Sequence, residues 1–244
     1  MSSTAPAIAA QKNLAAQKNL AEPNDLAAQN DHAVQGRHRS GRLPPSADDE
    51  RFTALLRGLP WPGAGGADSL KTVGFTSCRG GEGVSTVAAR LAVRAAELGG
   101  RGVLLVDANL LRPAVERLFG LAREAGLSDV LLENCELSAA IRTTHVERLR
   151  VLSAGRRAVH PDEVHDPARM AELVATLKED FDLVVFDLPA AGEIVSAACL
   201  AALLDGVVLV VEAQQTSWEA AQRVTRQLSR ANARLLGAVL NDRL

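Results

Sequence analysis

A glycine-rich segment at residues 78–86 has the composition of a loop that binds phosphate. It reads Cys-Arg-Gly-Gly-Glu-Gly-Val-Ser-Thr and lies between an apolar run that is typical of a strand and a pattern that is typical of a helix. Glycines allow backbone N–H groups to converge on an anion, and the N-terminus of the following helix adds a favourable dipole. The predicted phosphate-binding residues are Gly80, Gly81, Glu82, Gly83, Val84, Ser85 and Thr86. A tight turn that only joins strand to helix is the structural alternative.

Two further apolar runs each end in a carboxylate, at Asp107 and Asp187. Carboxylates at strand ends beside a phosphate loop can hold Mg²⁺ directly or through water, and one of them can accept a hydroxyl proton. Asp107 and Asp187 are therefore the predicted catalytic residues, and together with the hydroxyl of Ser85 they are the predicted metal ligands. Either aspartate taken alone also fits a strand-end turn or a helix cap.

The elements that must position these residues follow from the alternation of apolar runs with helical patterns. Such alternation predicts an α/β domain with a parallel sheet and right-handed crossovers, in which ligands bind at the C-terminal ends of the strands. The expected strands cover residues 71–77, 102–107, 149–153, 182–187, 206–212 and 235–241. The expected helices cover residues 84–98, 167–179, 194–204 and 217–231, after a short helix from Asp48 or Asp49 to Leu59.

Composition and charge exclude several classes of protein. The formal net charge of −2 gives no case for binding nucleic acid. The three cysteines form no CxxC pair, which favours a reduced, cytoplasmic setting without disulfides. The most apolar stretch, residues 194–211, is interrupted by Asp205 and Gly206, so it is interpreted as a buried helix and strand and not as a transmembrane segment.

The first part of the chain has a different character. A six-residue unit, Ala-Ala-Gln-Lys-Asn-Leu, begins at Ala9 and repeats with weakening fidelity to His32. We interpret residues 1–48 as a disordered, low-complexity tail and residues 49–244 as the folded domain. A docking segment is the functional alternative for the repeats. A small basic cluster at residues 37–42 is interpreted as a solvated linker, with weak contact to an anionic membrane as the alternative.

The motifs between about residues 70 and 241 resemble those of a known family, the bacterial tyrosine kinases of exopolysaccharide biosynthesis. These are the CpsD/CapB-like proteins and the C-terminal domain of Wzc, within the MinD/ParA class of deviant P-loop ATPases. The matching pieces are Gly81-Glu82-Gly83-x-Ser85-Thr86 and the segments at residues 104–109, 112–113, 126–131, 152–155, 181–189 and 237–241. They occur in the order that the family has.

The resemblance implies a fold, ligands and a partner. The fold would be a three-layer, parallel-sheet P-loop NTPase that binds ATP and Mg²⁺. Gly81, Gly83, Ser85 and Thr86 would cradle phosphates, and Asn241 would contact adenine. The expected partner is a membrane-embedded regulator of polysaccharide chain length (a co-polymerase), at the cytoplasmic face of the plasma membrane, with a homo-oligomer left open.

The chain also departs from the family pattern. Val84 stands where the P-loop lysine is expected, and the second motif, Asp-x-Asp-x-Arg, has Asn109 and Leu111 in place of its second carboxylate and its arginine. No tyrosine is present, whereas relatives continue into a tail with clustered tyrosines. A helix with Glu-x-x-Arg-x-x-Arg that mediates ring assembly in relatives would begin at Glu50, but both arginines are absent. These departures predict a degenerate regulatory or scaffolding module with weak or absent ATP turnover.

Two alternatives remain at this point. In the MinD-like register the signature lysine falls on Arg79, and an arginine there could reach the phosphates of its own or a facing subunit. The second interpretation is therefore an active kinase or ATPase that uses Arg79 in place of the lysine. The third is a partitioning ATPase of the MinD/ParA type, which the segments after Asp107 disfavour.

Overall fold

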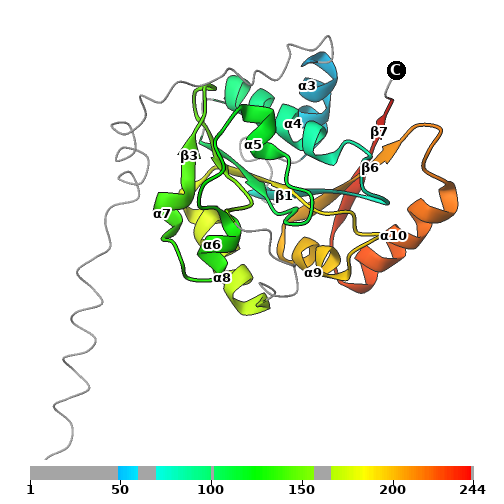
Figure 1. Cartoon of the computed structure of the whole chain (residues 1–244). Coiled ribbons are helices and arrows are strands. Elements are labelled where there is room, and N and C mark those ends of the chain that lie inside the picture. The colour runs from blue at the N-terminus through cyan, green and yellow to red at the C-terminus, as the bar shows by residue number, and fades with distance from the viewer. Residues whose placement is uncertain (1–48, 60–69, 100–101, 157–165, 243–244) are drawn as a thin grey trace, which may run out of the picture. The chain divides into compact units, whose positions relative to one another are not determined.

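The computed structural model describes residues 49–59, 70–99, 102–156 and 166–242, and the predicted tail at residues 1–48 lies outside them. The described part contains a seven-stranded sheet in the order β3-β4-β2-β5-β1-β6-β7 (Figure 1). The strands are β1 Thr72–Ser77, β2 Val103–Asp107, β3 Ile141–Thr143, β4 Leu149–Leu152, β5 Leu183–Asp187, β6 Gly206–Glu212 and β7 Leu235–Asn241. The helices are α3 Asp49–Gly58, α4 Val84–Gly99, α5 Val115–Phe119, α6 Leu127–Leu131, α7 Leu137–Ala140, α8 Pro167–Asp180, α9 Val195–Leu203 and α10 Trp218–Arg230.

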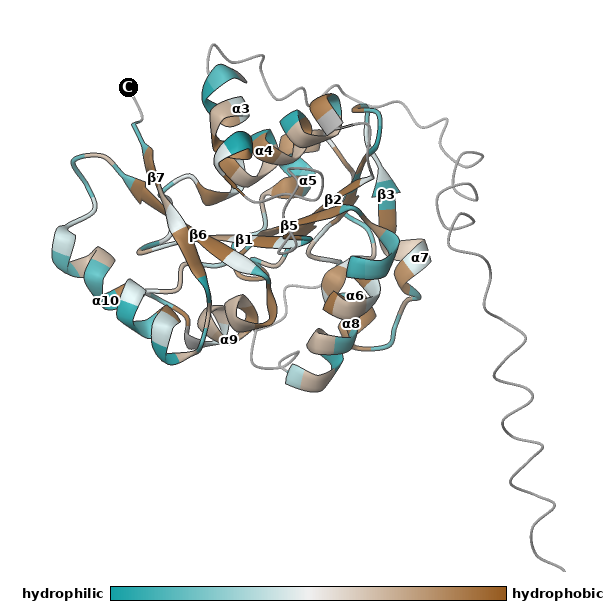
Figure 2. Cartoon of the chain, turned by 180° about the vertical axis from the view of Figure 1, so that it is seen from behind, coloured by the Kyte–Doolittle hydropathy of each residue, from teal (hydrophilic) through white to brown (hydrophobic). Residues whose placement is uncertain are grey.

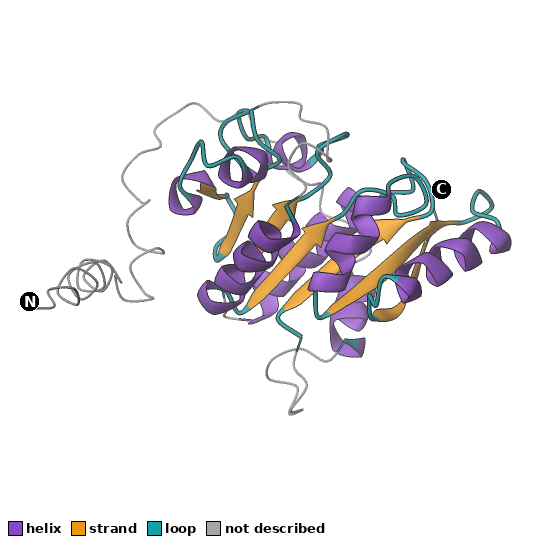
Figure 3. Ribbon diagram, turned by 90° about the horizontal axis from the view of Figure 1, so that it is seen from below, coloured by secondary structure: helices purple, strands orange, loops and turns teal. Residues whose placement is uncertain are grey.

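The predicted three-layer α/β architecture is confirmed. Figure 3 shows the strands side by side with helices on both sides of the sheet. Successive strand residues point to opposite faces, so each strand contributes to two cores. Val73 and Phe75 of β1 pack with α3, α4 and α5, whereas Val184 and Phe186 of β5 pack with α8, α9 and α10. Phe75 and Phe186 are fully buried on opposite faces of the sheet. Because helices cover both faces, successive residues of these strands are all buried, and the strands carry continuous apolar runs.

The expectation of a purely parallel sheet is corrected at one edge, where β3 runs antiparallel to β4. Only residues 144–148 separate the two strands, and so short a connection cannot make the crossover that parallel pairing requires. The expected strands were otherwise found within a residue or two of their predicted ends. The short helices α5, α6 and α7 were not predicted, since four or five residues do not establish a helical period.

The stretch at residues 194–211 forms α9 and β6, as predicted. Figure 2 shows hydrophobic residues concentrated in the strands, while α10 presents mostly hydrophilic residues. Among the residues that the structure describes, no helix combines the length and the hydropathy that crossing a bilayer requires.

The strand register places the candidate site at the C-terminal ends of the central strands. β2 and β5 are parallel neighbours, and Asp107 pairs with Asp187 at their C-terminal ends. β1 lies on the other side of β5 and leads at Ser77 directly into the glycine-rich loop. The sheet therefore brings the loop and both predicted carboxylates together.

At the N-terminal ends of the strands, Asp205 connects the start of β1 with the segment between α9 and β6 through hydrogen bonds. Its carboxylate accepts hydrogen bonds from the N–H groups of Lys71 and Thr72, each at 2.9 Å, and from the Lys178 ammonium at 2.6 Å. Burial acts to raise the pKa of Asp205, but these hydrogen bonds and the charge of Lys178 outweigh it and hold the pKa below its usual range.

We expect Asp205→Ala to lower the free energy of unfolding at pH 7 by about 2 kcal/mol, because three donors lose a charged acceptor. The folded-state pKa is depressed, so this stabilisation is present above the unfolded-state pKa and is lost as the pH falls through the folded-state value. Urea unfolding should therefore show a smaller difference between variant and wild type at pH 3 than at pH 7. Glu172→Ala, at an exposed position of α8, is the control, and a difference that stayed constant with pH would contradict this explanation.

Candidate functional site

The loop between β1 and α4 has a backbone that only glycine adopts easily. Gly81 and Gly83 have φ angles of 98° and 92°, in the left-handed region where a side chain is strained. The N–H of Val87 donates to the Gly83 carbonyl at 3.0 Å, so the α-helical ladder begins at Val87. The N–H groups before it lie at the open N-terminus of a 16-residue helix, where an anion is favoured.

Glu82 fixes the shape of this loop from inside. Its side chain is buried, and one carboxylate oxygen accepts from the N–H groups of Cys78 at 2.7 Å and Arg79 at 3.0 Å. The other accepts from the hydroxyl of Thr216. Asn241 at the end of β7 donates its amide to the Glu82 carbonyl at 2.9 Å. Glu82 and Asn241 therefore brace the loop, and the contact of Asn241 with adenine stays a prediction.

A cavity of about 230 Å³ lies beside the loop. Val84 lines it but is only 8% exposed and packs into the core under α4. The position of the expected lysine therefore contributes no charge to the cavity. The lining residues are Ser77, Gly80, Gly81, Gly83, Val84, Ser85, Thr86, Asn109, Arg112, Ala114, Arg117, Leu118, Leu188 and Ala190.

Asp107 is buried and its carboxylate is engaged by the backbone. One oxygen accepts from the Asn109 N–H at 3.2 Å, and the other accepts from the N–H groups of Ala114 and Val115, each at 3.0 Å. Burial raises the pKa of Asp107 to about 6, although the three N–H groups oppose the shift. Asp107 thus anchors both ends of the segment that runs along the cavity from Asn109 to the start of α5.

Asp187, its neighbour in the sheet, lacks such support. Neither carboxylate oxygen has a hydrogen-bond partner of good geometry within the described residues. Burial, and then the nearby charge of Asp107, raise the pKa of Asp187 well above its usual range, while the hydroxyl of Ser85 lowers it. A buried carboxylate without donors is a costly arrangement that a cation relieves.

Asp187 and Ser85 are therefore the residues that fit a Mg²⁺ ion best, because hard oxygen ligands lie beside the predicted phosphate position. Asp107 fits a supporting role, since its oxygens already accept from N–H groups. No cluster of three or more His, Cys, Asp or Glu side chains suited to a metal occurs in the described residues. Mg²⁺ in nucleotide sites commonly takes one or two protein oxygens together with phosphate oxygens and water.

The connection after β5 packs directly against the loop. The buried hydroxyl of Thr76 donates to the Pro189 carbonyl at 2.7 Å and accepts from the Ala191 N–H at 3.0 Å. A methyl group at Gly192 would overlap the Cys78 carbonyl, so only glycine permits this approach. The next residue, Glu193, accepts from the Gly80 N–H at 2.8 Å. A second acidic group thus lies at the rim of the phosphate loop, which the sequence patterns did not indicate.

Arg79 does not line the cavity beside Val84. Its guanidinium donates to the Gln215 carbonyl and lines a separate cavity of about 440 Å³ next to α10. Arg112 and Arg117 line the phosphate cavity instead. The sequence places Arg112 in a segment that resembles the family, without giving it a role, and no pattern indicated Arg117. The role of Arg79 toward a facing subunit stays a prediction.

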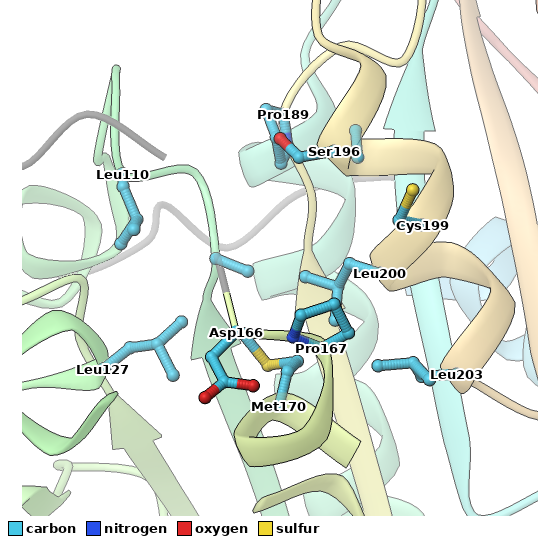
Figure 4. A pocket seen from close by; sticks show the side chains of 12 residues that line it. Leu110, Leu127, Asp166, Pro167, Met170, Pro189, Ser196, Cys199, Leu200 and Leu203 are labelled. Carbon is cyan, nitrogen blue, oxygen red and sulfur yellow. The ribbon is translucent and has the colours of Figure 1, made fainter. Parts of the chain in front are cut away.

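A third cavity, of about 80 Å³, is mostly apolar and lies where α6, α8 and α9 approach the loop after β2 (Figure 4). The side chains of Leu127, Met170 and Leu200 face it, and Asp166 lies at its margin. It shares none of its lining residues with the phosphate cavity.

Comparisons with known proteins extend over the same region. A family model described as "Cellulose biosynthesis protein BcsQ" matches residues 70–237. The chain is 33% identical over 200 residues to the tyrosine-protein kinase YwqD of Bacillus subtilis (strain 168), which covers 82% of this chain and 83% of that protein. The chimerical protein CapA2B2 has a similar crystal structure, with a TM-score of 0.74 and 28% identity over 82% of this chain and 87% of that one. MinD of Pyrococcus horikoshii OT3 in complex with Mg-ADP is also similar, with a TM-score of 0.62 and 28% identity over 70% of each chain.

Proposed function

Because the chain belongs to the family of bacterial tyrosine kinases related to YwqD and CapB, within the MinD-like P-loop proteins, we propose that it is a regulatory module of surface-polysaccharide synthesis. In this proposal it binds Mg-ATP weakly and turns it over slowly or not at all. Its fold serves mainly as a scaffold that other components of the pathway recognise.

The proposal is carried by one observation: the phosphate loop has a well-defined backbone, but an aliphatic residue, Val84, stands where the P-loop lysine is expected. The glycine angles, the Glu82 brace and the helix N-terminus all suit an anion. Val84, however, is packed into the core and offers no donor. A charge-assisted hydrogen bond contributes about 1.5–3 kcal/mol, so its loss weakens triphosphate binding by roughly ten- to a hundred-fold.

The composition argues against autophosphorylation on tyrosine. These 244 residues include no tyrosine, so they offer no tyrosine for phosphorylation in cis or in trans. Bound at Asp187 and Ser85, Mg²⁺ would supply charge neutralisation for the phosphates. Asp187 would orient the ion, and Asp107 would hold the segment opposite the loop.

For its partner we propose a membrane-embedded chain-length regulator, which would place the protein at the cytoplasmic face of the membrane. Membership of the family supports this proposal, together with the similarity to the chimerical protein CapA2B2. Ring assembly through α3 is less favoured, because α3 packs on α4 here. Thr53 accepts a hydrogen bond from Arg94 at 2.8 Å, and Leu56 is buried.

We expect Val84→Lys to bind Mg-ATP about ten- to a hundred-fold more tightly than the wild type. Val84 lines the phosphate cavity, so a lysine stem can replace the valine while its ammonium reaches the cavity. Titration calorimetry with Mg-ATP measures the change directly. Leu98→Lys, at an exposed position near the other end of the same helix, is the matched control and should leave the affinity unchanged.

Tight wild-type binding with steady ATP turnover would contradict the degenerate module and favour an active ATPase or kinase. A phosphate-release assay on the wild type distinguishes the two. Arg79→Ala tests whether Arg79 replaces the lysine in an active enzyme. Unchanged affinity for Mg-ATP in this variant would exclude that role.

A further inference from the structure

One wall of the phosphate cavity carries positive charge, although the loop residues that line this cavity carry none. This wall is the segment from Asn109 to Leu118, which crosses the C-terminal edge of the sheet opposite the loop. It contributes two guanidinium groups, those of Arg112 and Arg117, to the cavity lining. Arg79, which belongs to the loop, lines a different cavity.

We infer that Arg112 and Arg117 together supply to bound phosphates the positive charge that Val84 does not. The inference rests on the proposed function, since it names the residues that hold phosphate in the same site. Guanidinium groups suit this task because they donate two parallel hydrogen bonds to phosphate oxygens. Charge thus reaches the ligand from the β2–α5 segment and not from the loop.

Arg112 lies directly against the loop. A methyl group added at Gly80 would overlap Nη1 of Arg112, which shows that the guanidinium lies directly over this glycine. Its ion-pair partner is Glu193, whose Oε2 lies 3.7 Å from Nη1, a long separation between side chains that are 68% and 40% exposed. An exposed pair of this kind contributes little stability, so a phosphate can take over the guanidinium at small cost.

Arg117 is positioned by the short helix α5. Val115 and Phe119 of this helix are buried and pack into the core beneath α4, which leaves Arg117 on the outer side. Asp107 fixes the start of the helix by accepting from the N–H groups of Ala114 and Val115. Neither a hydrogen bond nor an ion pair engages the Arg117 side chain within the described residues, so it is available to a ligand.

Glu193 behaves as an internal substitute for the ligand. Its carboxylate accepts from the Gly80 N–H at 2.8 Å and faces Arg112, so it occupies two groups that an anion at the loop rim would use. Phosphate must therefore displace Glu193 from this position. It follows that removing the charge of Glu193 should strengthen phosphate binding, and that part of this gain should depend on the presence of Arg112.

The test is a calorimetric titration of the full chain with Mg-ATP, AMP and inorganic tripolyphosphate. We expect Arg112→Ala and Arg117→Ala each to bind Mg-ATP and tripolyphosphate about ten-fold more weakly than the wild type, and the double variant about a hundred-fold more weakly. AMP binding should change less, since AMP has one phosphate. Glu193→Gln should bind tripolyphosphate several-fold more tightly, and this gain should shrink in the Arg112→Ala background. Arg226→Ala, an exposed arginine of α10, is the control.

The outcomes separate the two proposals. A double variant that binds Mg-ATP and tripolyphosphate as the wild type does would overturn the inference alone. A wild type and a Val84→Lys variant that both fail to bind either probe would overturn the proposed function and this inference with it. Adding Val84→Lys to the double variant should restore tripolyphosphate binding, because the charge is then returned to the loop. Failure of this rescue in a folded protein would also count against the inference.

Discussion

Replacing Glu82 by alanine is expected to lower the free energy of unfolding by about 3 kcal/mol, because the buried N–H of Cys78, the partly buried N–H of Arg79 and the hydroxyl of Thr216 lose one shared acceptor. Burial of unpaired donors costs more than the hydrogen bonds themselves contribute. The same change should weaken Mg-ATP and tripolyphosphate binding, since the loop then no longer holds its N–H groups in one arrangement.

Two measurements check this prediction. Urea unfolding gives the stability change, and calorimetry on the variant gives the loss of phosphate affinity. Glu82→Gln is the informative comparison: its single amide oxygen can accept from the two N–H groups but its NH₂ group cannot accept from Thr216, so an intermediate effect is expected. Glu172→Ala controls for the loss of an exposed glutamate. Equal stability of Glu82→Ala and wild type would show that the loop does not depend on this carboxylate.

Much of the architecture was predictable because its elements are long and locally encoded. The apolar runs of β1, β2, β5 and β6 and the helical pattern of α4 are each sufficient to identify their element. Parallel pairing then requires the strand ends to meet at one edge, and the register of Asp107 with Asp187 confirms this expectation. Glycine at positions 81 and 83 was equally informative, since both have positive φ.

The polar contacts of the site were not predictable, because they depend on which segments pack side by side. Nothing local distinguishes the glutamate that braces the loop from one that faces solvent. The direction of Arg79 is decided by the Gln215 carbonyl, 136 positions away in the chain. Arg117 reaches the cavity only because α5 is anchored by buried residues, and α5 is too short to be recognised from its sequence.

Because of these contacts, the charges around the loop are arranged differently from those in a site with a P-loop lysine. The negative groups Glu82 and Glu193 engage the loop backbone, and the positive groups come from the opposite wall. Because the opposite wall is anchored by Asp107, the placement of positive charge depends on a residue of the sheet edge. A change at Asp107 should therefore affect phosphate binding through the position of Arg112 and Arg117.

The neighbouring carboxylates Asp187 and Asp107 should respond in opposite ways to the same substitution. Asp187→Asn is expected to raise the free energy of unfolding at pH 7 in EDTA by about 1–3 kcal/mol, because a buried, unpaired charge is removed. Burial and the charge of Asp107 raise the folded-state pKa of Asp187. The folded state is therefore favoured below the unfolded-state pKa, where this carboxyl is protonated, and that stability is lost as the pH rises through the folded-state pKa. Asp107→Asn should instead destabilise, since three N–H groups lose a charged acceptor.

Magnesium distinguishes a ligand role of Asp187 from a purely structural one. Wild-type protein should be stabilised by Mg-ATP in thermal unfolding, since a ligand that binds only the folded state shifts the equilibrium toward it. Asp187→Asn should start from a higher melting temperature and gain little from Mg-ATP, because an amide is a weaker Mg²⁺ ligand than a carboxylate. A variant that is less stable than wild type in EDTA would show that Asp187 is not a strained carboxylate. A variant that keeps the full Mg-ATP stabilisation would show that Asp187 is not the metal ligand, and Ser85 would then lack its expected partner.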